Sequence, residues 1–216
     1  MSKPIDNFCL QVTEVKKLND IFQYNQRILT AGIDISGILR SQIVFVVSAL
    51  DYYIHSVILY ETIDILKDNK THSSSFGKLT LGLDSVNMLI NDVAADSFAL
   101  IGQEIKHKLS WKSFQQPDKI AEALQIVCDK KIWSEVSSLM GQSSSDIKEQ
   151  LRLIVKRRDS IAHEADFDIV NQCQYSISHT DVTKAVNFIV SLVYMIDSIV
   201  FNYQYDDTIV HQQFIT

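Results

Sequence analysis

Three side chains near the end of one predicted helix could perform acid–base and electrostatic chemistry together. Arg158 carries a guanidinium that stays charged at physiological pH. His163, five residues later, can exchange a proton near neutral pH. Asp159 lies four residues before His163, so on a helix its carboxylate can reach and orient the imidazole. The spacing predicts a site where a cation stabilises negative charge while a histidine moves a proton. The alternatives are an arginine whose head extends from the core into water, and a surface histidine in a minor ion pair.

The helix over 147–165 must position these residues, and it places Arg158 on its apolar face. At about 100° per residue, Arg158 falls in the middle of one apolar stripe, whose members are Ile147, Leu151, Ile154, Ile161, Ala162 and Ala165. A buried guanidinium needs an anion, either an internal carboxylate or one arriving from outside. His163 lies about 140° around the helix from Arg158. One copy could bring the two together only if the arginine reached around the helix, whereas a two-fold dimer could line one cleft with both copies.

A local surplus of positive charge surrounds the same turns. Residues 146–163 carry five basic and three acidic side chains, in a chain whose formal net charge is −6. Arg152, Lys156 and Arg157 are therefore candidates for contacts with RNA phosphates, with solvated charge as the alternative. The acidic total excludes a general nucleic-acid coat protein, so any polyanion site must be local.

The remaining chain predicts one all-α domain over residues 1–216, a bundle of five or six helices. Few turn residues (6 Gly and 2 Pro) and 46% hydrophobic composition favour long helices. Apolar spacings of three and four predict helices over 5–30, 35–66, 84–109 and 117–128. Asp146 with Glu149 predicts the start of the helix that carries Arg158, and Thr180 with Asp181 predicts the start of the last helix, 182–203.

Other residues are assigned less specific roles. Asp51 and His55, four apart on the predicted helix 35–66, could face the same cleft as Arg158, although a satisfied core pair is the favoured interpretation. Core packing rather than base stacking is expected for Trp111 and Trp133. The core or a dimer seam is expected for three tyrosines: Tyr194, Tyr203 and Tyr205.

Composition further predicts a cytoplasmic protein without a membrane segment, metal or cofactor. The two most apolar stretches, 43–60 and 186–201, contain polar side chains and fall short of about 20 apolar residues. Three cysteines without a paired motif fit a reducing compartment. The sequence has no metal-ligand cluster and no glycine-rich phosphate loop.

The string Arg158-Asp159-Ser160-Ile161-Ala162-His163 resembles the signature of the HEPN superfamily. That signature is an arginine, a polar residue, three further residues and a histidine, late in an all-α bundle. Residues 155–164 are similar to the form in the RiboL-PSP and MAE_28990-like branches. Residues 48–55 and 113–120 also resemble segments of those branches, so the resemblance extends over about 40–205.

The resemblance implies a metal-independent endoribonuclease, a toxin or phage-defence effector whose site is shared across a homodimer. It makes Arg158 and His163 the catalytic pair and Asp159 the polar residue of the motif. The implied partners are an RNA substrate and an antitoxin or regulatory protein. A tyrosine used for modification in one sub-branch is replaced here by Ala165, so that control is not inferred. The alternatives are a catalytically inactive HEPN-like module that binds RNA or a protein, and a helical adaptor without a nucleic-acid role in which Arg158 pairs with a buried carboxylate such as Asp51.

Overall fold

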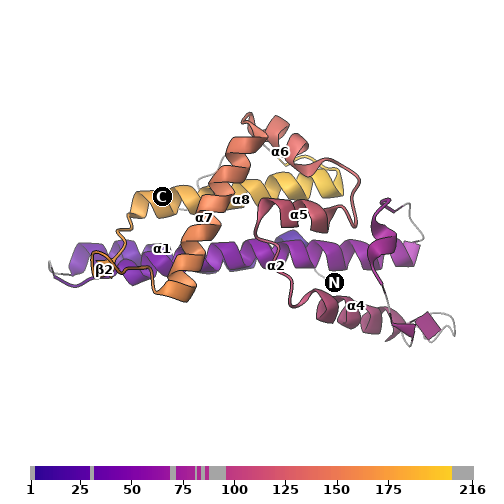
Figure 1. The fold of residues 1–216 in the computed structure, drawn as a ribbon, viewed down its shortest axis with the longest axis horizontal. Helices are drawn as coiled ribbons and strands as arrows, with labels where there is room; N and C mark the ends of the chain where they lie inside the picture. The colour runs from indigo at the N-terminus through magenta and orange to yellow at the C-terminus, as the bar shows by residue number, and fades with distance from the viewer. Residues whose placement is uncertain are drawn as a thin grey trace.

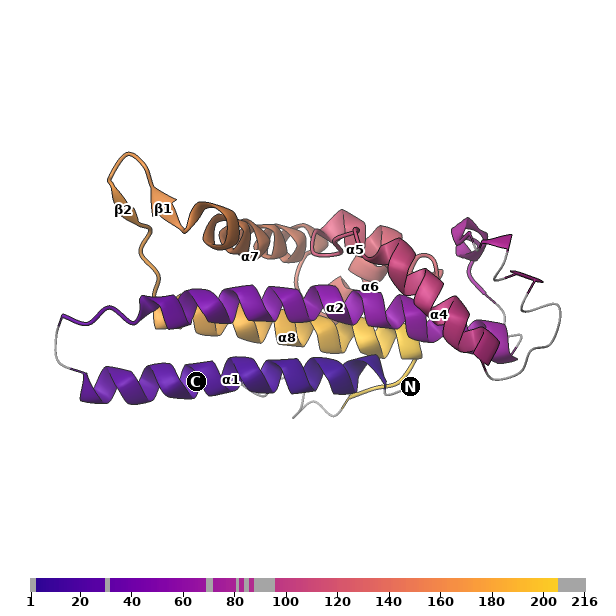
Figure 2. The same ribbon diagram turned by 90° about the horizontal axis from the view of Figure 1, so that it is seen from below.

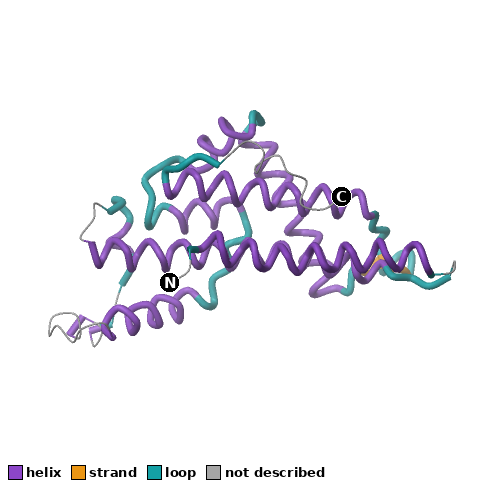
Figure 3. The backbone as a smooth tube through the Cα atoms, turned by 180° about the vertical axis from the view of Figure 1, so that it is seen from behind, coloured by secondary structure: helices purple, strands orange, loops and turns teal. Residues whose placement is uncertain are grey.

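The polypeptide folds almost entirely into α-helices. The computed structural model describes residues 3–29, 32–68, 72–80, 82–83, 86–87 and 96–205. These ranges contain seven α-helices, a short 3₁₀ turn (Phe76–Lys78) and a single two-stranded hairpin. Figure 3 shows how little of the described backbone is strand. The prediction of an all-α, HEPN-like bundle is confirmed.

Three long helices run lengthwise through the molecule: α1 (Pro4–Ile28), α2 (Ser36–Asp68) and α8 (His179–Phe201) (Figure 1). The central helix, α2, packs against both α1 and α8 and also against α4, α5 and α7. Because neighbours cover it on several sides, α2 is apolar around most of its circumference. The outer helix α1 buries one face through Phe8, Val12, Val15 and Phe22, at helical spacing, and exposes Tyr24 on the opposite side.

Helix α7 (Ser144–Glu164) packs on α2 on the side away from α1 (Figure 2). Three shorter helices precede it: α4 (Asp96–Leu109), α5 (Pro117–Leu124) and α6 (Ile132–Met140). The predicted stripe of α7 is buried as expected at Ile147, Leu151 and Ile154, whereas Ala162 and Ala165, near the end of the helix, are exposed. The bundle therefore holds α7 by its apolar face and leaves the other face open to solvent.

Helix starts and ends differ from the predictions in detail. The N-cap of α7 is Ser143 and that of α8 is Ser178, and each hydroxyl accepts a hydrogen bond from a backbone N–H three residues on, Asp146 or Asp181. The predicted caps at Asp146 and Thr180 were therefore two or three residues late, because a serine outside the apolar pattern can still cap. Helix α5 ends four residues before the predicted 128, and α6 was not predicted. Part of the predicted helix 84–109 lies outside the described residues.

A hairpin follows α7 and stands out from the bundle on the side away from α1 (Figure 2). Its strands are β1 (Phe167–Asp168) and β2 (Cys173–Gln174), paired antiparallel. The turn between α7 and β1 has two consecutive left-handed residues, Ala165 (φ 54°) and Asp166 (φ 55°). A left-handed conformation costs a non-glycine residue about 1–2 kcal/mol, so this turn requires compensating contacts.

Two helical segments, Ser36–Lys67 and His179–Phe201, are long and apolar enough to cross a membrane by length and composition alone. Half of the most apolar window in the first and 67% of that in the second are buried in the bundle. Core helices pass the same test, so packing within the fold accounts for their composition.

The aromatic residues divide between core and surface. Trp133 is buried, and its indole N–H donates to the carbonyl of Pro117 at 2.9 Å. Trp111 is 69% exposed, so the expectation that it packs in the core was wrong. Tyr194 is buried, and the hydroxyls of Tyr203 and Tyr205 bond to the buried carboxylate of Asp197.

Candidate functional site

Arg158 lies where the sequence placed it, largely buried in line with the core-facing residues of α7. Its side chain is 15% exposed, and its Nε is buried without a hydrogen-bond partner among the described residues. Its Nη1 lies 3.1 Å from Oδ1 of the neighbouring Asp159. Because Asp159 is about 100° further around the helix, the guanidinium turns from the core stripe toward the open face of α7.

His163 lies on that open face, in the last turn of α7. Its side chain is exposed and makes no hydrogen bond or ion pair within the part of the chain that the structure describes. The expected pair between Asp159 and His163 does not form, because the carboxylate of Asp159 pairs with Arg158 instead. Asp159 therefore positions the arginine, and the imidazole is free to meet a ligand.

Asp51 and His55 form a structural pair on α2. Asp51 Oδ1 accepts a hydrogen bond from the backbone N–H of Phe114 at 2.5 Å. His55 Nε2 lies 3.1 Å from the carbonyl of Lys112 and 3.9 Å from Asp51 Oδ2. These bonds join α2 to the segment that leads into α5. Asp51 therefore has partners other than Arg158, and the ion pair that Arg158 makes is with Asp159.

Arg157, the neighbour of Arg158, is held by a buried carboxylate. Its Nη2 donates to Asp166 Oδ2 at 2.7 Å and to the carbonyl of Ser176 at 2.9 Å. The same Asp166 oxygen accepts from Arg40 Nε at 2.7 Å, and Asp166 has no exposed surface. We call Arg40, Arg157 and Asp166 the buried ion triad. It joins the start of α2, the end of α7 and the hairpin, and it compensates the strained turn at Asp166.

The triad changes the interpretation of Arg157. The sequence predicted a phosphate contact, whereas its inner nitrogen is committed to Asp166 and backbone carbonyls. The side chain remains 31% exposed, so only part of it is available to a ligand. The main role of Arg157 is therefore to fix the end of α7.

The other two predicted cations differ from each other. Arg152 lies 3.6 Å from Asp118 and 3.7 Å from Glu149, two exposed carboxylates. Lys156 is exposed and has no hydrogen bond or ion pair to any residue in the described ranges. Of the three, Lys156 is thus the cation most available to an incoming phosphate.

The profile of the RiboL-PSP-HEPN family matches residues 12–202 of the chain. The chain belongs to the RiboL-PSP-HEPN family. No curated protein and no solved structure matches the chain significantly. Membership of this HEPN family suggests either a ribonuclease or an RNA-binding module.

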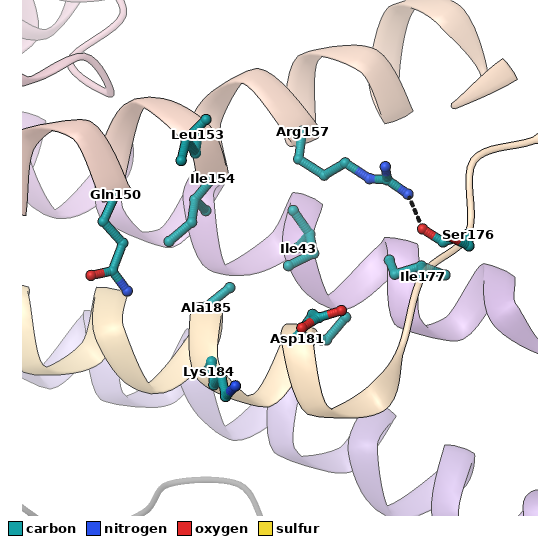
Figure 4. A pocket seen from close by; sticks show the side chains of 11 residues that line it. Ile43, Gln150, Leu153, Ile154, Arg157, Ser176, Ile177, Asp181, Lys184 and Ala185 are labelled. Carbon is teal, nitrogen blue, oxygen red and sulfur yellow. Dashed lines mark hydrogen bonds between the residues drawn. The ribbon is translucent and has the colours of Figure 1, made fainter. Parts of the chain in front are cut away.

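The open side of the HEPN helix α7 borders two hollows. One, of about 430 Å³, extends along the open face and is lined by Lys156, Asp159 and Tyr175, among others. The second, of about 480 Å³, lies between α7, α2 and the start of α8. Figure 4 shows Arg157 at the second hollow, bonded to Ser176. The first hollow shares Asp159 with the motif and is therefore the better candidate for a ligand.

Sequence reasoning missed Arg40, Asp166 and Tyr175 as residues of this region in the HEPN chain. Arg40 and Asp166 are 126 positions apart, and no periodicity links them. One signal was present, because Arg40 interrupts an apolar helix in the same way as Arg158 does. Among the described residues no group of three His, Cys, Asp or Glu side chains is placed to hold a metal ion.

Proposed function

We propose that this HEPN chain is a metal-independent endoribonuclease, and that Arg158 and His163 perform the reaction. The observation that carries the proposal is the state of Arg158. Its stem is buried, its Nε is unpaired among the described residues and its outer nitrogen faces the open side of α7 at Asp159. A permanent cation held in this way is suited to a phosphate that arrives from solvent.

RNA supplies its own nucleophile for this reaction. A base removes the proton of the 2′-hydroxyl, the oxygen attacks the adjacent phosphorus, and the bond to the 5′-oxygen breaks as that oxygen takes up a proton. His163 is assigned the proton transfer and Arg158 the stabilisation of charge on the phosphoryl oxygens. Asp159 keeps the guanidinium turned toward the open face. The products are a 2′,3′-cyclic phosphate and a 5′-hydroxyl.

A homodimer would complete the site. His163 lies near the middle of the open face of α7, and the guanidinium of Arg158 reaches that face from one side. Two copies related by a two-fold axis, with these open faces toward each other, would place two histidines and two arginines around one RNA phosphate. Cleavage per protomer should then fall on dilution, in step with dimer dissociation measured by light scattering.

The biological setting that we propose rests on family association alone. The enzyme would act in the cytoplasm as a toxin or phage-defence effector, and an antitoxin or regulatory protein would restrain it. Expression of the parent chain should then slow growth, whereas the alanine variants at 158 and 163 should not.

The decisive experiment is incubation of the full chain with total RNA in excess chelator, followed by chemical analysis of the new ends. Arg158→Ala and His163→Ala should each lower the cleavage rate at least 10²-fold, since acid–base help alone contributes about 10²–10⁴. Arg27→Ala and His107→Ala, which change exposed residues of the same types on α1 and α4, should leave the rate unchanged. Equal rates for all four variants would refute the assignment.

A second candidate is a catalytically inactive RNA-binding module. The observation that favours it is the ion pair itself, because Asp159 partly neutralises Arg158 and does not orient His163. In that case the parent chain should bind RNA without cleaving it. Asp159→Asn should then tighten binding, because it leaves the arginine charge uncompensated.

A further inference from the structure

The aromatic ring of Tyr175 stands on the open side of α7, beside the motif. Tyr175 directly follows β2, and its side chain is 43% exposed. The guanidinium carbon of Arg157 lies 5.8 Å from the ring centroid, within the range of a cation–π contact. Arg157, a member of the buried ion triad, therefore contacts the ring of Tyr175, and part of the ring remains open to solvent.

The backbone of Tyr175 is fixed on both sides. Its N–H donates to the carbonyl of Asp166 at 2.8 Å, and its carbonyl accepts from Arg40 Nη2 at 2.7 Å. Both partners belong to the triad, whose central carboxylate has no exposed surface. The backbone of Tyr175 is thus fixed by one backbone hydrogen bond and one charge-assisted bond, so little further ordering is required when a ligand meets its ring.

The hollow beside Tyr175 combines three kinds of surface. Leu153, which is 59% exposed, contributes an apolar wall. Lys156 contributes an ammonium without a partner among the described residues. Asp159, which also lines the hollow, contacts Arg158. An aromatic face, an apolar wall and a cation together match the base and phosphate of one nucleotide.

We propose that Tyr175 is a stacking residue for a base of single-stranded RNA, and that Lys156 contacts a phosphate of the same strand. The proposal rests on the proposed function and adds a substrate preference to it. Every base offers a flat face, so stacking tolerates many sequences. In a duplex these faces are covered by neighbouring bases, and the site therefore favours unpaired RNA.

The test uses the full chain carrying His163→Ala, which keeps the substrate intact, and a fluorescent unstructured RNA strand whose binding is followed by anisotropy. In this background Tyr175→Ala should weaken binding of the strand by about 5- to 150-fold, the range for loss of one stacked base. Tyr175→Phe and Tyr175→Trp should keep the affinity, since both retain a flat ring. Tyr24→Ala, which removes a 64% exposed tyrosine of α1, is the matched control and should change nothing.

Salt dependence separates the two contacts. Lys156→Ala should lower the slope of log affinity against log salt by about 0.7, the value for one phosphate of a single strand. Tyr175→Ala should leave that slope unchanged, because it removes no charge. Circular dichroism melting of each variant shows that the fold is retained, and a blunt duplex of the same sequence should respond little to Tyr175→Ala.

The results of this test and of the cleavage assay can be told apart. Strand binding by Tyr175→Ala that equals that of the background, or that falls equally for strand and duplex, overturns the stacking proposal even if Arg158 and His163 prove catalytic. Selective loss of strand binding supports it even if total RNA is never cleaved, an outcome that removes the ribonuclease assignment alone. A background protein that binds no RNA overturns both.

Discussion

Two buried carboxylates, Asp166 and Asp197, are stabilised in opposite ways, and neither has exposed surface. Asp166 lies at the end of the bundle that carries Arg158 and His163, and two guanidinium groups bind it. Asp197 lies 18 residues along α8 from His179, about 27 Å at the rise of an α-helix. Its partners are the neutral hydroxyls of tyrosines.

The cation-bound carboxylate fixes chain segments that the hydrophobic core does not reach. Around Asp166, the hairpin exposes Ile169 and Val170 and has few buried apolar side chains of its own. The two arginines bond to Asp166 and to the carbonyls of Tyr175 and Ser176, so they join α2, α7 and the hairpin in one network. Directional, charge-assisted bonds replace apolar packing at this end of the molecule.

The tyrosine-bound carboxylate lies inside the apolar core instead. Tyr53 donates to Asp197 Oδ1 at 2.7 Å, and Tyr203 and Tyr205 donate to Oδ2. Burial, the largest cause, raises the pKa of Asp197, and the hydrogen bonds from Tyr205 and Tyr53 act in the opposite direction. Burial also raises the pKa of Tyr53 well above its usual 10.0. The described hydrogen-bond donors to Asp197 are tyrosine hydroxyls rather than cations, and its raised pKa makes this attachment of the segment after α8 depend on pH.

The largest effect is expected from Asp166→Ala. It leaves Arg40 buried and both guanidinium groups without their carboxylate, and breaking a buried pair in this way costs about 3–5 kcal/mol. Urea denaturation should show this loss in the free energy of unfolding. Asp168→Ala, in the exposed part of the same hairpin, is the control and should show a much smaller loss. Equal losses for the two variants would mean that any acidic residue of the hairpin stabilises the fold as much as Asp166 does, and that the buried ion triad has no special role.

A smaller effect is expected from Tyr53→Phe. The ring is fully buried, so the change removes one hydroxyl and leaves Asp197 Oδ1 with one donor fewer. Removing one partner of a buried hydrogen bond costs about 1–3 kcal/mol, which is the expected fall in the free energy of unfolding. Tyr24→Phe, at an exposed position of α1, should be neutral. No loss from Tyr53→Phe would show that Asp197 does not depend on this hydroxyl.

The pH dependence of stability distinguishes the two regions more finely. Because folding raises the pKa of Asp197, its contribution to stability is complete below the usual 3.8 and is lost as pH rises through the raised value. Asp197→Asn should flatten this decline, at a cost of about 1 kcal/mol for the altered hydrogen bonds.

Asp168 provides a control of opposite sign for that titration. Its pKa is lowered, chiefly by the side chain of Asn171, so its contribution is lost as pH falls below 3.8. Asp168→Asn should therefore make the free energy of unfolding fall less steeply as the pH drops below 3.8. Urea denaturation across a series of pH values measures both slopes, and identical slopes for the two variants would contradict the assignment.

The contrast between these regions marks how far the sequence could predict the structure. Apolar periodicity was sufficient for the long helices and for the burial of Arg158, because one element and its core-facing stripe determine both. It could not predict that Asp159 would pair with Arg158 rather than His163. Helical spacing favours Asp159 with His163, because adjacent residues do not face each other, and only the side-chain conformations of the folded protein bring Asp159 to Arg158.

Local sequence patterns could not predict the buried ion triad or the tyrosines that bond to Asp197. Asp166 meets Arg40 across 126 positions, and Tyr53 meets Asp197 across 144. Each contact depends on how α2 packs against α7 and α8, and helical spacing within one segment carries no information about that packing. The same limit explains why Tyr175, which is placed by a hairpin that was not predicted, was missed.

The smallest effect is expected from Arg152→Ala, which contrasts an exposed arginine of α7 with the buried ones. Arg152 is 43% exposed, and its distances to Asp118 and Glu149, 3.6 and 3.7 Å, exceed those of a good hydrogen bond. Exposed pairs contribute about 0–1 kcal/mol, so urea denaturation should show a change of about 0.5 kcal/mol at most. Arg157→Ala, five residues on, removes a partner of buried Asp166 and should cost several times more. If Arg152→Ala instead destabilises the fold as strongly as Arg157→Ala does, then burial does not separate the arginines that hold α7 in place from those that remain available to RNA.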